Sequence, residues 1–427
     1  MRQACHSRTR QCIGALFISI AGYAATGFSG AAWSLTGTVI DARTHALIAG
    51  AIVVATNATA LSDASGRFAL SSSTGQVSAR AVGYRRAHAD AGDKDSITLE
   101  LEPFRPKAVY LSAYGINSKP LRDATLALTR DTVINALVID VKDDRGLPPY
   151  RGGAREAAGA VPGKSSHLPE RQMFVARLAE LHGNGLYLIA RIVVFKDDPL
   201  AEVHPEWAVR DASGKPWRDR EELQWVDPFS QGVWRHNLDI AEEAARLGFD
   251  EVQFDYVRFP DASGLRFAQR NTRDNRTAAI VGFLSAARER LAPYNVFVSA
   301  DTFGYVCWNP DDTSIGQDIG TLGTALDYIS PMLYPSGFTW ELPGCMNPVA
   351  DPAQIVRRSL AQARQRTGLP GVRFRPWLQA FRDYAFDHRE FGAQAIREQV
   401  QAAEGADTDG WMRWNPRNRY DPAELPH

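Results

Sequence analysis

The feature that most constrains this sequence is a series of short apolar segments that alternate with amphipathic stretches from residue 108 to residue 414. The segments are continuously apolar, as strands buried on both faces of a parallel sheet are. Eight such strands alternating with helices predict a (β/α)8 TIM barrel. An open doubly wound sheet is the alternative, but no Gly-rich phosphate-binding turn follows the first segment. The predicted strands are Ala108–Ile116, Ala136–Lys142, Gly185–Phe195, Glu251–Arg258, Asn295–Phe303, Ala325–Tyr334, Phe374–Phe381 and Thr408–Trp414.

The segment before the barrel, residues 33–104, has a different pattern. Short runs such as Leu35–Asp41 and Ile97–Leu101 read as strands, and Asp63-Ala64-Ser65-Gly66 reads as a turn. We therefore predict a small, mainly antiparallel all-β sandwich, joined at Pro103–Lys107 to a barrel domain over residues 105–427. The runs Gly37-Thr38-Val39, Gly50-Ala51, Asp63–Phe68 and Gly83-Tyr84 resemble carboxypeptidase regulatory-like domains. That resemblance implies an accessory module without catalytic residues.

The first residues have the composition of an export signal. Arg2, Arg8 and Arg10 precede a short apolar run, and small residues follow at 29–32. We expect a signal peptide over residues 1–32, a periplasmic or secreted protein, and no integral membrane span after cleavage; an uncleaved anchor is the alternative. Two cysteines remain beyond the signal, Cys307 and Cys345, and in an oxidising compartment we expect them to form a disulfide.

Composition excludes some partners and cofactors. The formal net charge is -1 and no basic run occurs after the first residues, so nucleic acid is not an expected partner. No Cys or His cluster has metal-ligand spacing, and we expect neither a metal nor another cofactor. The sequence leaves the oligomeric state open.

Polar residues near the ends of the predicted strands are the candidate site, because barrel enzymes work at the carboxyl ends of their strands. The candidate catalytic residues are Asp255, Asp301 and Asp140. Asp255 and Asp301 end neighbouring strands, which lie about 5 Å apart, and glycoside hydrolysis uses two carboxyl groups. The structural alternatives are an Asp255–Arg258 ion pair, an Asp301 that satisfies loop amides, and an Asp140–Lys142 pair. The candidate substrate-binding residues are Lys142, Arg191, Arg258, Tyr334, Gln379 and Trp414.

Two further groups of residues have more than one interpretation. Asp143 and Asp144 are interpreted as a solvated turn, and His204 as a packing or capping residue. The tryptophans of the predicted βα loops fit either sugar stacking or loop packing. These are Trp207, Trp217, Trp225, Trp308 and Trp340.

Residues 104–427 resemble a glycoside hydrolase family that is defined by a domain of unknown function. The motifs that carry the resemblance are Val138–Asp143, His204–Trp207, Trp225–Pro228, Phe249–Pro260 and Ser330–Pro335. The resemblance implies a TIM barrel that acts on polysaccharide. Related barrel lipoproteins often have two consecutive acids after the fourth strand, whereas here Tyr256 follows Asp255. The second acidic role is then expected to belong to another residue, with Asp301 as the candidate.

These observations predict a glycosidase that cleaves O-glycosidic bonds of a bacterial or environmental polysaccharide or oligosaccharide. Asp255 is the candidate nucleophile or transition-state stabiliser, and Asp301 the candidate acid/base. A catalytically idle carbohydrate-binding barrel is one alternative. Another hydrolytic or lyase reaction is the second, because the fold does not determine the chemistry.

Overall fold

The structure is a computed structural model that describes residues 35–425 except 57, 72–74, 93, 162–167 and 341. The predicted signal peptide lies outside the described residues. The strands are β1 (Leu35–Asp41), β2 (Ile52–Ala55), β3 (Ala58–Leu61), β4 (Arg67–Leu70), β5 (Gln76–Arg80), β6 (Ala87–Asp90), β7 (Ser96–Leu101), β8 (Lys107–Leu111), β9 (Ala136–Lys142), β10 (Tyr187–Val193), β11 (Glu251–Asp255), β12 (Phe297–Phe303), β13 (Tyr328–Met332), β14 (Trp377–Gln379) and β15 (Trp411–Trp414). The helices are α1 (Ala113–Asn117), α2 (Lys119–Asp131), α3 (Ala154–Ala157), α4 (Arg171–Gly183), α5 (Asp198–Val203), α6 (Gln231–Arg246), α7 (Arg273–Leu291), α8 (Ile319–Leu322), α9 (Pro352–Thr367) and α10 (Ala393–Gly405).

Strands β1–β7 form two small sheets with the orders β4-β1-β7 and β3-β2-β5-β6. Their inward side chains, among them Val53, Phe68 and Leu99, form a separate apolar core. The all-β domain predicted before the barrel is therefore present. Its pairing is antiparallel apart from β1 with β7, which is parallel. The resemblance to regulatory-like domains stays a prediction.

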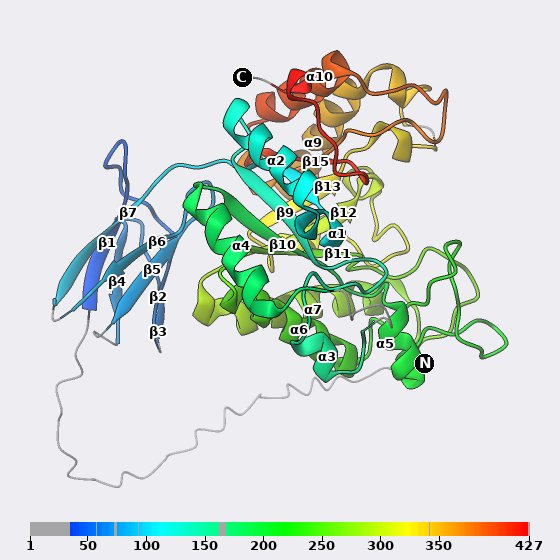
Figure 1. Ribbon diagram of the computed structural model, residues 1–427, viewed down its shortest axis with the longest axis horizontal. Helices are drawn as coiled ribbons and strands as arrows, with labels where there is room; N and C mark the ends of the chain where they lie inside the picture. Colours follow the sequence, from blue (N-terminus) through cyan, green and yellow to red (C-terminus); the bar gives the residue numbers. More distant parts are fainter. Residues whose placement is uncertain are drawn as a thin grey trace, which may run out of the picture.

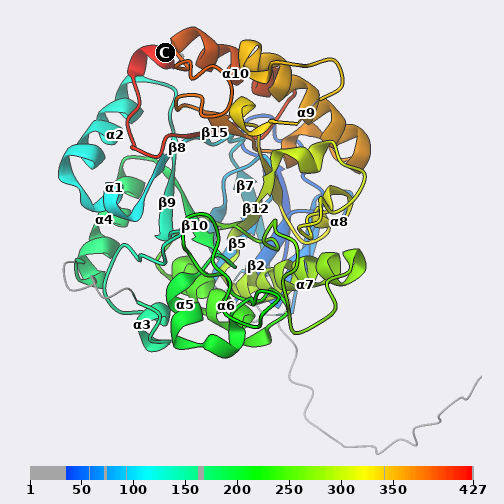
Figure 2. The same cartoon turned by 90° about the vertical axis from the view of Figure 1, so that its right-hand side faces the viewer.

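The second domain is the predicted barrel. Strands β8–β15 close in the order β10-β11-β12-β13-β14-β15-β8-β9, with parallel pairing throughout. β9 and β10 are buried along their whole length, which explains why their sequences are largely apolar and do not alternate. Figure 2 looks toward one end of this barrel, with the helices around the strands and the blue sheets of the first domain behind it.

Several predicted strands are too long, and each has a local cause. β8 ends at Leu111 because the Ser112 side chain accepts the N–H of Gly115 and caps α1. β11 ends at Asp255 because Tyr256 adopts a left-handed conformation with φ 46°. β15 begins only after Gly410, which has φ 73°.

The sandwich packs against the end of the barrel where the strands begin (Figure 1). Val82 and Phe104 join the apolar cluster inside the barrel, beside Tyr187 and Tyr328. The backbone N–H of Gly83 donates to the hydroxyl of Tyr328 at 3.2 Å. The amino-terminal domain thus covers one end of the barrel, and the opposite end is left for a site.

The predicted disulfide is not formed. Cys307 and Cys345 are both buried and both free. They belong to the apolar cluster between the strands and the helices, and burial raises the pKa of the Cys307 thiol to about 12. A thiol in such surroundings is an apolar packing group with little thiolate character.

Candidate active site

Residues from the carboxyl ends of the strands line a cavity of about 180 Å³ at the end of the barrel away from the sandwich. Six of the predicted site residues line it: Arg191, Asp255, Arg258, Asp301, Tyr334 and Trp414. The remaining lining residues are Tyr256, Phe303, Met332 and Trp377. The barrel therefore brings together side chains that lie more than 200 residues apart in the chain.

Arg191 connects two of the candidate carboxylates. Its Nε and Nη2 donate to the same oxygen of Asp255, at 3.0 and 2.5 Å, and its Nη1 donates to Asp140 at 2.7 Å. The guanidinium is buried and lies 4.9 Å from the Trp414 ring centroid. Asp255 thus pairs with Arg191 rather than with Arg258. Charge-assisted hydrogen bonds of this kind stabilise an ionised carboxylate and fix its orientation.

Asp301 has a different environment. It is buried, and one carboxyl oxygen accepts the indole N–H of Trp377 at 2.7 Å. The other oxygen is buried without a hydrogen-bond partner among the described residues. Burial, followed by the negative charge of Asp255, raises the pKa of Asp301 well above its ordinary value. The barrel therefore holds one carboxyl that favours its protonated form beside one whose charge is stabilised by arginine.

Tyr256 stores backbone strain next to Asp255. Its φ of 46° is unusual for a residue with a bulky side chain, and its N–H donates to Asp255 Oδ1 at 2.6 Å. Strained residues of this kind persist where the surrounding structure determines them, and they cluster at functional sites. The strained turn directs Asp255 into the cavity.

Aromatic rings form the walls. Trp414 stacks on Tyr110 with ring centroids 3.9 Å apart and meets Trp377 edge-on at 5.5 Å. Tyr110 also donates its hydroxyl to Asp140 at 2.5 Å. Asp140, which does not line the cavity, is a buried partner of Arg191 and Tyr110 beneath it.

Two predicted binding residues lie elsewhere. Lys142 is buried between the strands and α6, where its ammonium pairs with Asp197 at 2.5 Å and donates to Asn237 at 2.8 Å. The alternative interpretation, a pair with Asp140, is not what the structure shows, because Asp140 pairs with Arg191. Gln379 accepts the N–H of Ser336 and donates to the Ser336 hydroxyl, so it anchors the loop after β13. Neither residue lines the cavity. The polar atoms of Lys142 bind Asp197 and Asn237, and those of Gln379 bind Ser336.

Asp143 is only partly as predicted. Its carboxylate accepts the N–H groups of Arg145 and Leu147, as in a turn. Its side chain is half-buried rather than fully solvated, and burial together with the neighbouring Asp140 raises its pKa to about 7.

The sequence did not point to Trp377 or Tyr110. Both are aromatic residues within apolar strands, and such a pattern predicts core packing. Only the strand register brings the indole N–H of Trp377 to Asp301 and the hydroxyl of Tyr110 to Asp140.

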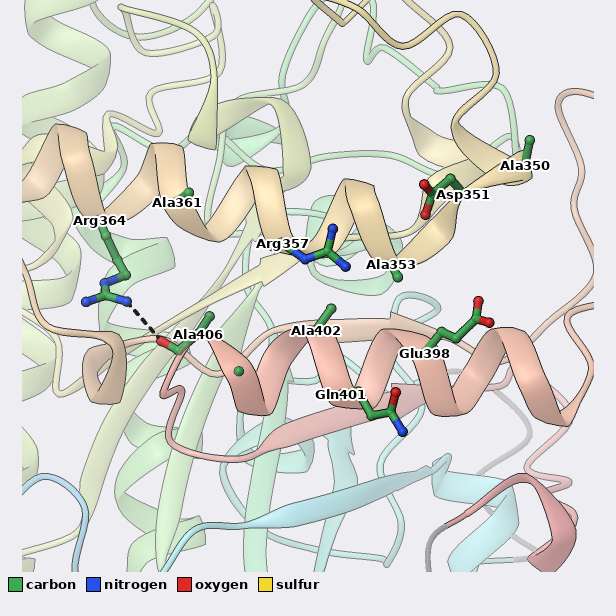
Figure 3. A pocket seen from close by; sticks show the side chains of 11 residues that line it. Ala350, Asp351, Ala353, Arg357, Ala361, Arg364, Glu398, Gln401, Ala402 and Ala406 are labelled. Atoms are coloured by element: carbon green, nitrogen blue, oxygen red, sulfur yellow. Dashed lines mark hydrogen bonds between the residues drawn. The ribbon is translucent and has the colours of Figure 1, made fainter.

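A larger hollow, of about 720 Å³, lies between α9 and α10 on the outer helix layer (Figure 3). Small residues such as Ala353 and Ala402 line it, and Arg364 donates to the carbonyl of Ala406 at its edge. It contains no residue from a strand end, so the smaller cavity is the better candidate for chemistry. Within the described part of the chain, no group of His, Cys, Asp or Glu is placed to hold a metal ion. The described helices include none that is long and apolar enough to cross a membrane.

Comparisons with known proteins agree with this architecture. The family model DUF4015, described as "Putative glycosyl hydrolase domain", matches residues 108–420. The PgaB (BpsB) glycoside hydrolase domain from Bordetella bronchiseptica is 16% identical with a TM-score of 0.54, covering 74% of this chain and 95% of that one. A beta-galactosidase from the psychrophilic Marinomonas ef1 is 12% identical with a TM-score of 0.53, covering 75% and 58% respectively.

A hypothetical protein from Ruminiclostridium thermocellum is 35% identical with a TM-score of 0.39, covering 45% of this chain and 96% of that one. No curated protein matches the sequence. The likenesses to the PgaB domain and to the beta-galactosidase show the barrel fold alone.

Proposed function

Since this chain belongs to the DUF4015 family of glycosyl hydrolase domains, we propose that it cleaves O-glycosidic bonds of a bacterial or environmental polysaccharide. The observation that carries the proposal is the contrast between Asp255 and Asp301 on adjacent strands. Arg191 stabilises the charge of Asp255, whereas burial favours the proton on Asp301. Two carboxyls whose environments differ in this way suit the acid and base roles of a glycosidase.

In the proposed reaction, Asp301 donates its proton to the leaving glycosidic oxygen. As a nucleophile, Asp255 forms a glycosyl ester that water then hydrolyses, with Asp301 taking the proton of that water; as a base, Asp255 takes the proton of a water that attacks the sugar carbon directly. In both routes the charge of Asp255 stabilises the oxocarbenium-like transition state. Arg191 keeps Asp255 oriented, while Tyr334 and the Trp414 and Trp377 rings form the walls against a sugar ring. The leader-like residues 1–32 support export, so we propose action in the periplasm or outside the cell.

The test is a screen of the purified protein against bacterial exopolysaccharides and cell-wall glycans, with detection of new reducing ends. On a substrate that the protein cleaves, Asp255→Asn and Asp301→Asn should each lower turnover at least about 10²-fold, because an amide neither ionises nor transfers a proton. The double variant should lose little more than the worse single variant. Asp274→Asn, an exposed change at the start of α7, is the matched control and should retain activity.

Near-normal turnover by Asp255→Asn would contradict the assignment, and Asp140 would then be the next carboxylate to test. If the protein binds a glycan but releases no reducing ends from it, the idle carbohydrate-binding barrel is the better description.

A further inference from the structure

A second pocket, of about 370 Å³, lies beside the candidate catalytic cavity. Arg258 and Phe303 line both, so the two pockets are adjacent. The catalytic cavity alone, at about 180 Å³, is below the roughly 300–1,000 Å³ of typical ligand pockets. We propose that the second pocket is a sugar-binding subsite that holds the part of a polysaccharide chain extending beyond the bond to be cleaved.

Trp340 gives this pocket an exposed aromatic face. Its side chain is 65% exposed, which is unusual for a tryptophan. Tyr305 holds the backbone in place: its hydroxyl accepts the N–H of Trp340 at 2.6 Å and donates to the carbonyl of Trp340 at 2.7 Å. An exposed indole on a held backbone presents a flat apolar surface of the kind that packs against the face of a pyranose ring.

The other loop tryptophans do not have this arrangement. Trp225 is buried, Trp308 donates its indole N–H to Ser359 on α9, and Trp207 stacks on His204 with centroids 4.0 Å apart. These side chains serve packing within the protein. Trp340 is the exposed member of this group that also lines a pocket.

A strained loop forms another part of the pocket lining. Thr313 and Ser314 both have left-handed backbones, with φ 54° and 57°. The buried Asp312 holds the loop, since it accepts two hydrogen bonds from Arg276, at 2.7 and 3.0 Å, as well as the N–H groups of Ser314 and Gly316. Strain of about 1–3 kcal/mol per residue persists only where a structure determines it, and it concentrates at ligand-binding positions.

The charges indicate the class of sugar. Asp261 and Asp311 line the pocket together with one cation, Arg258, whose guanidinium lies 5.0 Å from the Trp225 ring. A second cation, Arg273, donates to the carbonyl of the lining residue Pro310 but is paired with Asp318 at 3.0 Å. The carboxylates therefore still outnumber the cations, which disfavours an anionic sugar by like-charge repulsion. The subsite therefore fits pyranose rings without carboxylate groups, that is, neutral or amino sugars.

This inference rests on the proposed function. A binding measurement tests the subsite separately from the cleavage reaction. The probes are cello-, chito- and de-N-acetylated chito-oligosaccharides of two and six units, with hexagalacturonate as the anionic comparison. They are titrated calorimetrically into the full chain carrying Asp301→Asn, in which slowed turnover leaves time to measure binding. In this background, Trp340→Ala should weaken binding of a hexasaccharide about tenfold, equivalent to about 1.4 kcal/mol, and that of its disaccharide less than about twofold.

Two variants serve as controls. Trp340→Phe keeps an aromatic face and should restore most of the affinity. Met346→Ala removes another exposed apolar side chain from the same loop, 92% exposed and outside the pocket, and should change nothing.

The outcomes distinguish the two proposals. If the unmodified protein cleaves a hexasaccharide that Trp340→Ala binds with unchanged affinity, the subsite is overturned and the hydrolase stands. If binding depends on Trp340 but the unmodified protein releases no reducing ends, the subsite stands and the hydrolase fails. If no neutral or amino-sugar hexasaccharide binds, or if hexagalacturonate binds best, the subsite as described is overturned.

Discussion

Asp255 and Asp301 have the same side chain, but the fold stabilises the charged form of one and the neutral form of the other. Asp255 compensates the charge of Arg191, which is buried, whereas Asp301 is held toward its neutral form by burial. Asp301→Asn should therefore leave the free energy of unfolding within about 1 kcal/mol of the native value. Asp255→Asn should cost up to about 3–5 kcal/mol, because removing one partner of a buried ion pair leaves the other uncompensated. Chemical denaturation measures both values; equal losses in the two variants would contradict this contrast.

Asp301 contributes to the pH dependence of stability and, as the general acid, to that of activity. Its pKa in the folded protein is raised above the ordinary value of 3.8, so folding favours the protonated form. That contribution is fully present below about pH 4 and is lost as the pH rises through the raised pKa. A general acid also has to be protonated, so kcat/KM should fall over the same alkaline range.

Comparison with Asp301→Asn isolates this effect. The difference in unfolding free energy between native protein and variant should shift in favour of the variant as the pH rises. Asp143→Asn is the necessary second comparison, because the pKa of Asp143 is also raised, to about 7. If Asp143→Asn rather than Asp301→Asn removes the alkaline change in stability, the assignment to Asp301 is wrong.

At the scale of elements, glycine decides where the last strand begins. Gly410 precedes β15 with φ 73°, and a Cβ there would lie 1.9 Å from the carbonyl oxygen of Pro106. That carbonyl accepts the N–H of Trp411, so it cannot move without loss of the hydrogen bond that begins the pairing of β15 with β8. Gly410→Ala should cost about 2–5 kcal/mol, since overpacking adds about 1–3 kcal/mol to a left-handed penalty of about 1–2 kcal/mol.

Gly264 is the matched control for this change. Its φ is 75°, but an added Cβ would meet nothing within 4 Å. Gly264→Ala should therefore cost only the conformational penalty of about 1–2 kcal/mol. Thermal unfolding of both variants gives the comparison, and similar losses would show that the contact with Pro106 is not decisive.

At the scale of the whole molecule, the sandwich and the barrel share a buried ion pair. Arg80 and Asp327 are 2.6 Å apart and both about 5% exposed. Burial by itself would raise the pKa of Asp327, but Arg80 and Arg288 lower it below its ordinary value. Arg80→Met should cost about 3–5 kcal/mol because it leaves Asp327 buried with a weaker partner. Arg67→Met, an exposed change in the same domain, should stay within about 0.5 kcal/mol.

The same interface bears on the predicted separation of the domains near Pro103–Lys107. A chain that begins at Arg105 lacks Arg80 and Val82 and exposes the floor of the barrel around Tyr328. We still expect it to fold and to keep the activity of the full chain, but to unfold at a lower temperature. A truncated chain as stable as the full one would show that the interface contributes little.

The sequence by itself determined the local patterns and the order in which they occur. Largely apolar segments separated by amphipathic ones indicate the barrel, because strands buried on both faces are predominantly apolar rather than alternating. Polar residues after such segments identify the candidate end of the barrel. Asp255, Asp301 and Arg191 are therefore predictable from their positions in the chain.

Only the tertiary structure decided which neighbour each side chain meets. Strand register and barrel closure bring Arg191 between Asp140 and Asp255. They also direct Lys142 toward Asp197 at the helix layer, and they bring the indole of Trp377 to Asp301. Hydrogen bonds and the burial of charge act over a few ångströms between residues far apart in sequence. Their partners are therefore fixed by packing, which local sequence patterns do not record.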